Sequence, residues 1–109
     1  LFFAGQITGV EGYVGNAASG MVAGINSMRM LSNCEPLTFP KATMIGALCS
    51  YVSKASAKTF QPMKPNFGIL PDLVPPIGRK KWPKSERGAA YSRRAFEHLE
   101  TFLANHQMT

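Results

Sequence analysis

The sequence predicts part of an α/β protein that is itself mostly α-helical, with one short amino-terminal strand and a long proline-rich irregular segment. Three observations predict this fold class. An unbroken apolar run opens the chain at residues 1–4, apolar residues recur at helical spacing in three later segments, and most of the 8 prolines lie between residues 60 and 83. Hydrophobic residues make up 45% of the sequence and charged residues 17%, which is typical of a globular protein rather than a disordered one.

The amino-terminal run and the loop behind it form the strongest local pattern. Residues 1–4 have the continuous apolar character of a strand buried inside a sheet. The loop then places Gly5, Gly9 and Gly12 ahead of a helical pattern, which lets main chain approach a ligand while amide groups at the helix start point outward. The same glycines also fit a plain tight turn, and they do not complete a dinucleotide-binding fingerprint.

The first helix is expected over residues 13–31, where apolar and small residues recur every three or four positions and share one face. This face consists of Val14, Ala18, Met21, Ile25 and Met28. We expect it to pack on a sheet. Gly20 and Gly24 lie four positions apart and are expected to allow close backbone contact, and Asn33 is expected to stop the helix.

Two more helices are expected further along the chain. Residues 44–52 are apolar on more than one side and should be largely buried. The last helix is expected to start near Ser85 and to be amphipathic. Its apolar face consists of Tyr91, Ala95, Leu99, Phe102 and Leu103. Residues 60–83 hold too many prolines for regular structure and too many apolar residues for a free linker, which indicates a functional segment or one packed against another domain.

The net charge of +6 is concentrated in one stretch near the carboxy terminus. Its cations, opposed there by Glu86 alone, are Arg79, Lys80, Lys81, Lys84, Arg87, Arg93 and Arg94. A localised basic patch favours a polyanionic partner such as RNA, because Lys and Arg bind phosphate and release counterions. Trp82 adds an aromatic face that could stack on an unpaired base. The alternative is a solvated charged helix on which Trp82 pins the helix while the lysines face water.

The chain opens without an initiator methionine or a leader, so we expect a longer parent protein, with exposed apolar surface where the missing amino-terminal part packs. No apolar run approaches the roughly 20 residues that cross a bilayer, which predicts no membrane segment. Cys34 and Cys49 have no metal or redox spacing and indicate reduced cytosolic thiols. His98 and His106 lack nearby ligands, so no metal site is expected.

Two runs of the sequence resemble a known family. Residues 1–26, LFFAGQITGVEGYVGNAASGMVAGIN, resemble the closing FAD-contacting segment of the GidA-like flavoproteins. Within that group, TGVEGY at residues 8–13 and FQPMKPNFGILP at residues 60–71 are similar to the TrmFO family rather than to GidA itself. The resemblance covers nearly the whole chain and implies the carboxy-terminal part of a cytoplasmic enzyme with a GidA-like FAD-binding fold.

The resemblance implies a methyltransferase for carbon five of a T-loop uridine in tRNA. Methylenetetrahydrofolate would supply the carbon and reduced FAD the reducing equivalents, with NAD(P)H as reductant. Residues 1–33 would close the FAD-binding domain, and residues 34–109 would form a mostly helical tail with the basic patch. The catalytic residues are expected upstream of this chain, so they stay unknown and the chain alone should be inactive.

The resemblance also implies which residues bind. The cofactor-binding residues would be Gly5, Gln6, Gly9, Val10, Glu11, Gly12 and Tyr13. Among them, the amides of Gly12 and Tyr13 would donate toward the isoalloxazine edge, Tyr13 could also stack on the flavin ring, and Gln6 would face the ribityl chain. Glu11 is either a polariser near the flavin or a simple partner of the helix dipole. The RNA-binding residues would be Arg79, Lys80, Lys81, Trp82, Lys84, Arg87, Arg93 and Arg94.

One departure and three alternatives remain at this point. Where the family often has glutamate and serine, this chain has Gly15 and Asn16, which puts a role for the missing carboxylate in doubt. A sister enzyme acting on ribosomal RNA would use the same cofactors. A non-catalytic RNA-binding or assembly module would keep the basic patch and bind tRNA without an upstream domain. A GidA-like partner protein would have a longer helical tail.

Overall fold

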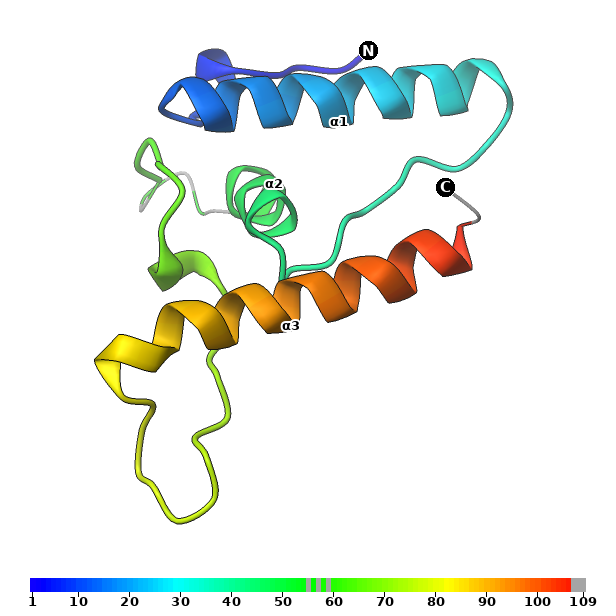
Figure 1. Cartoon of the computed structure of the whole chain (residues 1–109). Helices are drawn as coiled ribbons and strands as arrows, with labels where there is room; N and C mark the ends of the chain where they lie inside the picture. Colours follow the sequence, from blue (N-terminus) through cyan, green and yellow to red (C-terminus); the bar gives the residue numbers. More distant parts are fainter. Residues whose placement is uncertain (55, 57, 59, 107–109) are drawn as a thin grey trace.

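A computed structural model describes residues 1–54, 56, 58 and 60–106. In this part of the chain three α-helices form, α1 (Tyr13–Leu31), α2 (Met44–Lys54) and α3 (Lys84–Asn105), together with two short 3-10 helices, η1 (Gln6–Thr8) and η2 (Phe67–Ile69). Figure 1 shows α2 end-on between α1 and α3. The prediction of a mostly helical chain is therefore confirmed, with each helix close to its expected place.

The predicted strand at residues 1–4 does not form, and the expectation that it is buried is wrong. These residues have no regular secondary structure, and Leu1 and Phe3 are 104% and 68% exposed. A strand is held by hydrogen bonds to a neighbouring strand. The described residues offer no such neighbour, since their one β-pairing is an isolated parallel bridge between Val10 and Met63. The amino-terminal segment instead runs along α1 (Figure 1), where the Gly5 N–H donates to Ser19 Oγ at 2.9 Å.

Helix α1 has the expected bounds but turns a different face to the rest of the chain. Asn33, the second residue after the helix, adopts a positive φ of 60°, as expected of a stop residue. Val14, Met21 and Met28 of the predicted face are all more than half exposed. The reason is that the described part of the chain contains no sheet on which that face could pack. The side toward the core carries the buried Asn26, with Val22 and Ile25 packed against the core, so Ile25 of the predicted face does contribute to packing.

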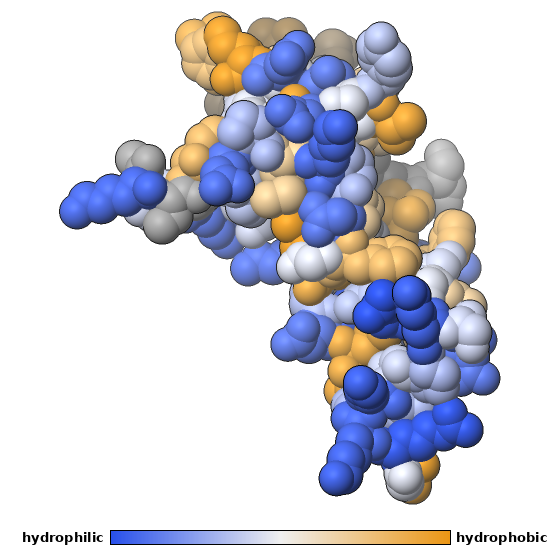
Figure 2. Space-filling model, turned by 90° about the vertical axis from the view of Figure 1, so that its left-hand side faces the viewer, coloured by the Kyte–Doolittle hydropathy of each residue, from blue (hydrophilic) through white to orange (hydrophobic). Residues whose placement is uncertain are grey.

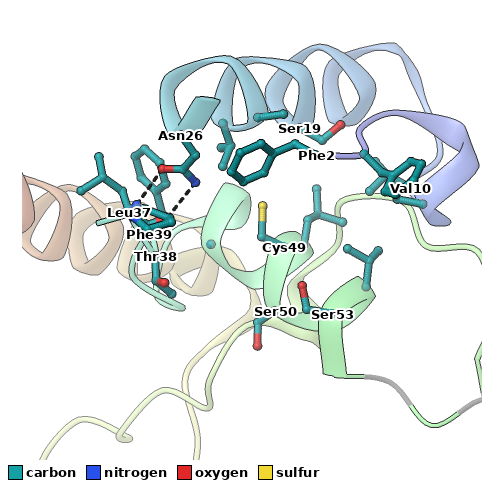
Figure 3. A pocket seen from close by; sticks show the side chains of 18 of the residues that line it. Phe2, Val10, Ser19, Asn26, Leu37, Thr38, Phe39, Cys49, Ser50 and Ser53 are labelled. Carbon is teal, nitrogen blue, oxygen red and sulfur yellow. Dashed lines mark hydrogen bonds between the residues drawn. The ribbon is translucent and has the colours of Figure 1, made fainter. Parts of the chain in front are cut away.

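Asn26 ties the connector between α1 and α2 to the middle of α1. Its buried side chain accepts a hydrogen bond from the Leu37 N–H at 2.6 Å and donates one to the Leu37 carbonyl at 3.1 Å (Figure 3). Both polar atoms of a buried amide are thus satisfied, as burial requires. These hydrogen bonds hold Leu37 against α1, and Leu37 and Phe39 are both buried in the core.

The small core joins the connector to α3. Leu37, Phe39 and Phe102 form its buried centre, and the Phe39 and Phe102 rings lie 4.9 Å apart. Helix α2 is largely buried along Gly46, Ala47 and Leu48, as predicted. The connector crosses the start of α2 so closely that a Cβ on Gly46 would overlap the Pro40 carbonyl. Thr43 caps this helix by accepting the Gly46 N–H at 3.1 Å.

The remaining surface is uneven in polarity. Apolar side chains stay exposed along the amino-terminal segment and α1, in agreement with the expectation of uncovered apolar surface: Leu1, Phe3, Ile7, Tyr13, Val14, Met21, Met28, Met30 and Leu31. Strongly hydrophilic side chains gather at the opposite, lower end of the molecule (Figure 2). None of the helices in the described part has the length and apolar character needed to span a membrane.

Candidate functional site

The glycine loop adopts the backbone that its sequence predicts. Gly5, Gly9 and Gly12 have φ values of 82°, 100° and 89°, a region that side chains with a Cβ rarely enter. Their surroundings differ. A Cβ on Gly9 would overlap the Phe60 ring, whereas a Cβ on Gly12 would meet nothing within 4 Å. Gly9 therefore serves close packing, and Gly12 leaves the start of α1 open.

Residues 60–63 support this loop through two backbone hydrogen bonds and the Phe60 ring. The Glu11 N–H donates to the Met63 carbonyl at 2.8 Å, and the Met63 N–H donates to the Gly9 carbonyl at 2.7 Å. Between them Val10 is only 1% exposed, and it packs against Gly15. The periodicity and glycine spacing gave no sign of Phe60 and Met63 as supports. The one signal in the sequence is that both residues lie in residues 60–71, the second of the two runs that resemble the family. In the structure this run contacts the first, residues 1–26.

The start of α1 offers open hydrogen-bond donors. The amides of Gly12 and Tyr13 donate no hydrogen bond within the described part of the chain, and no side chain caps this helix. The side chains of Tyr13 and Gln6 are exposed. Free amides at a helix start, together with the positive end of the helix dipole, favour an anionic or electron-rich group.

Asn16, in the first turn of α1, carries an acceptor without a partner. Its Oδ1 is buried and has no hydrogen-bond partner among the described residues, although a buried carbonyl of this kind normally has one. It lies 4.0 Å from the position that a Cβ on Gly5 would take. A hydroxyl-bearing, electron-rich ligand satisfies both sets of groups. The loop residues therefore fit a flavin nucleotide.

A cavity of about 440 Å³ lies between the amino-terminal segment, α1 and α2 (Figure 3). The Phe2 ring and the Cys49 thiol point into it, and burial raises the pKa of that thiol. Among the predicted cofactor-binding residues, Val10 alone lines this cavity. The cavity is therefore separate from the open donors of Gly12 and Tyr13, and we do not assign the cofactor to it.

Three cations that precede α3, Arg79, Lys80 and Lys81, lie on a protruding loop, residues 74–82, which we call the basic loop (Figure 1). The loop turns at Gly78, which has a φ of 82°, and the Arg79 N–H donates to the Pro76 carbonyl at 3.0 Å. Arg79, Lys80 and Lys81 are all exposed. Trp82 is half-buried, and its Nε1–H donates to the Val74 carbonyl at 2.6 Å, which closes the loop at its base.

The other predicted RNA-binding residues divide into two groups. Lys84, Arg87 and Arg93 are exposed on α3. Arg94 is half-buried and faces the irregular segment, where its guanidinium donates to the Pro71 carbonyl at 2.6 Å and to the Asp72 carbonyl at 3.0 Å. Arg94 is therefore bound within the chain, whereas the other cations of this patch are exposed.

Cysteine and histidine positions in the described part give no metal site. No three His, Cys, Asp or Glu side chains there come close enough to hold an ion. Cys34 is exposed and unpaired, as is typical of a surface thiol. His106 packs on Phe102 with the rings 4.4 Å apart, and His98 is exposed.

Comparison with known proteins shows which family the chain resembles. The family model described as glucose inhibited division protein A (GIDA) matches residues 1–35. Over 94% of its length the chain is 52% identical to a protein of Exiguobacterium sibiricum and 53% identical to one of Natranaerobius thermophilus. Over 96% of its length it is 54% identical to one of Streptococcus pyogenes. All three are named methylenetetrahydrofolate–tRNA-(uracil-5-)-methyltransferase TrmFO.

The chain spans about a quarter of the length of these relatives, 23% in each case. Because the match covers 94% of the chain, it includes at least most of the glycine loop, of the three helices and of the basic loop. The chain is therefore homologous, over nearly its whole length, to one part of the TrmFO proteins, which confirms the predicted resemblance.

Proposed function

We propose that the chain is part of a folate- and FAD-dependent tRNA (uracil-5-)-methyltransferase, to which it contributes one side of the flavin site and part of the RNA-binding surface. One observation carries this proposal: about half of the residues are identical, over 94% of the chain, to proteins that bear this name. Because those proteins are about four times longer, the activity belongs to the longer protein. The chain alone is expected to be inactive.

In the flavin site the chain acts mainly through its backbone. The amides of Gly12 and Tyr13 donate toward the isoalloxazine edge, while Gln6 and the Asn16 Oδ1 face the ribityl hydroxyls. Gly9 keeps the loop in place against Phe60. When bound, FAD supplies the reducing equivalents for the transferred carbon of methylenetetrahydrofolate, and NAD(P)H is the proposed reductant.

Three other groups of the loop have supporting roles in this proposal. The Gly5 N–H is bound to Ser19, so Gly5 shapes the loop rather than donating to the ligand. Val10 is buried and acts by packing. Glu11, half-buried just before α1, is assigned as a partner of the positive helix end.

The exposed apolar residues of the amino-terminal segment and α1 support the proposal that this side meets the rest of the longer protein. Isolated exposed apolar residues are ordinary, but a contiguous set along one helix and the segment beside it is typical of an interface. In this proposal residues 1–33 complete the FAD-binding domain, and residues 34–109 follow as a helical tail. The division at residue 33 stays a prediction.

The experiment that tests the proposal uses the full-length protein from the gene that encodes this chain. We expect it to purify with the yellow absorption of bound flavin. It should transfer the labelled methylene carbon to an unmodified tRNA transcript when NADH or NADPH is present, and reside in the cytoplasm with its substrate. A colourless protein that takes up no FAD would overturn the proposal. Methylation of ribosomal RNA in place of tRNA would assign it to the sister activity.

A second candidate is a non-catalytic RNA-binding module, which the protruding basic loop favours. Such a module binds RNA through phosphate contacts and needs no flavin. Equilibrium binding of the 109-residue chain alone to tRNA separates the two. Affinity and specificity equal to those of the full-length protein would favour the module.

A further inference from the structure

We propose that Trp82 and Arg94, both predicted to contact RNA, are positioning residues that hold the basic loop in one shape, and that this loop binds RNA phosphates through Arg79, Lys80 and Lys81. The inference rests on the proposed function, because it takes RNA to be the partner. The inference divides the predicted RNA-binding residues into residues that position the loop and residues that contact phosphate, a division that the sequence does not show.

The first observation is the closure of the loop by Trp82. The Nε1–H, which is the single donor of an indole, is already used on the Val74 carbonyl at 2.6 Å. The side chain is half-buried rather than presented to solvent. An aromatic residue that stacks on a splayed base needs an accessible face. Trp82 therefore joins the two ends of the loop, residues 74 and 82, instead of extending from it.

The second observation is the anchoring of the segment that leads into the loop. Arg94 donates to the Pro71 and Asp72 carbonyls, and its guanidinium lies 5.3 Å from the centre of the Tyr91 ring. Tyr91 in turn stacks on Phe67 at 4.7 Å. A planar guanidinium with two carbonyl partners and an aromatic neighbour is committed to the protein. Arg94 thus fixes residues 71–72 on α3, two residues before the loop begins.

The third observation concerns what the closed loop presents. Its exposed cations are adjacent in sequence, and between residues 73 and 96 Glu86 is the only acidic residue. Figure 2 shows strongly hydrophilic side chains gathered at this lower end of the molecule. A phosphate backbone matches such a surface by charge. Because the loop is tied at both ends, less conformational freedom is lost on binding.

Two substitutions at one position separate positioning from stacking. Trp82→Phe keeps an aromatic face and removes the Nε1–H, whereas Trp82→Ala removes both. If Trp82 positions the loop, both variants of the full-length protein bind a tRNA transcript about 2- to 10-fold more weakly, the loss expected for one hydrogen bond. Trypsin, which cleaves after Arg79, Lys80 and Lys81, also cuts both variants faster than the parent. Lys41→Ala, at an exposed lysine on the connector, is the matched control and changes neither quantity.

The phosphate contacts have their own readout. Replacing Arg79, Lys80 and Lys81 with alanine makes the negative slope of log affinity against log salt shallower by about 2–3 units, since each phosphate contact contributes about 0.7–0.9. Trp82→Phe leaves that slope unchanged because it removes no charge. An unaltered slope in the triple variant overturns the assignment of these cations to phosphate.

Other results overturn the inference in distinguishable ways. If Trp82→Phe binds like the parent while Trp82→Ala is weakened, Trp82 stacks on a base. If the loop of the full-length protein resists trypsin without RNA in parent and variants alike, another part of the protein covers it. In either case the unmutated full-length protein still contains flavin and methylates tRNA, so the proposed function stands. A parent protein that binds no RNA refutes both proposals together.

Discussion

Replacing Gly9 with alanine tests most directly the proposal that the glycine loop forms part of the flavin site. Gly9 has a φ of 100°, which costs an alanine about 1–2 kcal/mol. The added Cβ would also overlap the Phe60 ring, and moving that ring out of its packed position costs about 1–3 kcal/mol more. We therefore expect the full-length Gly9→Ala protein to lose about 2–5 kcal/mol in its free energy of unfolding, measured by urea titration, and to purify with less bound flavin.

Gly12→Ala is the matched control for this substitution. Gly12 has a φ of 89° with a ψ of 154°, a backbone region nearly confined to glycine, but open space around a Cβ. Its stability cost should therefore come from the backbone alone, at about 1–3 kcal/mol, while flavin binding still weakens. Adding Phe60→Leu to Gly9→Ala should recover part of the lost stability, because the smaller side chain gives the Cβ room. Equal losses for both glycine variants, with no recovery in the double variant, would refute the packing argument.

Three further predictions address the rest of the chain. Gly20→Ala should raise the helicity of a peptide of residues 13–31, measured by circular dichroism, because it removes a cost of about 1 kcal/mol. In the full-length protein the same substitution should lower the melting temperature, because the open side of Gly20 is where α1 is expected to contact the rest of the protein; a raised melting temperature contradicts this. Phe102→Ala should lower the free energy of unfolding by about 3–5 kcal/mol in a urea titration, because Phe102 is buried, whereas Phe96→Ala, at a side chain that is 63% exposed, should change it by no more than about 0.5 kcal/mol. Equal losses for the two variants would contradict this. Since burial raises the pKa of the Cys49 thiol, iodoacetamide should label Cys49 more slowly than exposed Cys34 at pH 8, with the Cys49 rate rising toward that higher pKa; equal rates by mass spectrometry would contradict this.

The helices could be predicted because their signals are local. Helix α1 begins after Gly12 and ends before Asn33, and both residues are recognisable from their backbone preferences alone. The apolar face of α3 follows from its spacing, and Phe102 on that face is buried as expected. These features need no knowledge of what the rest of the protein does.

The strand and the packing face of α1 could not be predicted, because both depend on partners distant in the sequence. An apolar run such as residues 1–4 reports that a segment prefers burial, but not whether a neighbouring strand is present in the same chain. In α1 the buried polar residue Asn26 faces the core, while Met21 and Met28 remain exposed. Periodicity places residues on a common face, and only tertiary contacts determine which face is covered.

The candidate sites were predictable to different depths. The positive φ values of the glycine loop follow from residue type, and the open amides at Gly12 and Tyr13 follow from the helix start. The unpartnered oxygen of Asn16 has no sequence signature. Within the basic patch, composition distinguishes charged from uncharged residues, but it cannot separate Arg94, which is bound to two carbonyls, from an exposed neighbour such as Arg93.

The irregular segment connects the two proposed sites, which explains why a proline-rich run keeps so many apolar residues. At one end, the backbone of Met63 is hydrogen-bonded to Gly9 and Glu11 of the glycine loop. At the other, Pro71 is held by Arg94 beside the basic loop. Prolines restrict the backbone without requiring a hydrogen-bonded neighbour, so a segment of this composition can span the gap between α2 and α3 in a fixed shape. The glycine loop and the basic loop are thereby supported by the same stretch of chain, residues 60–72.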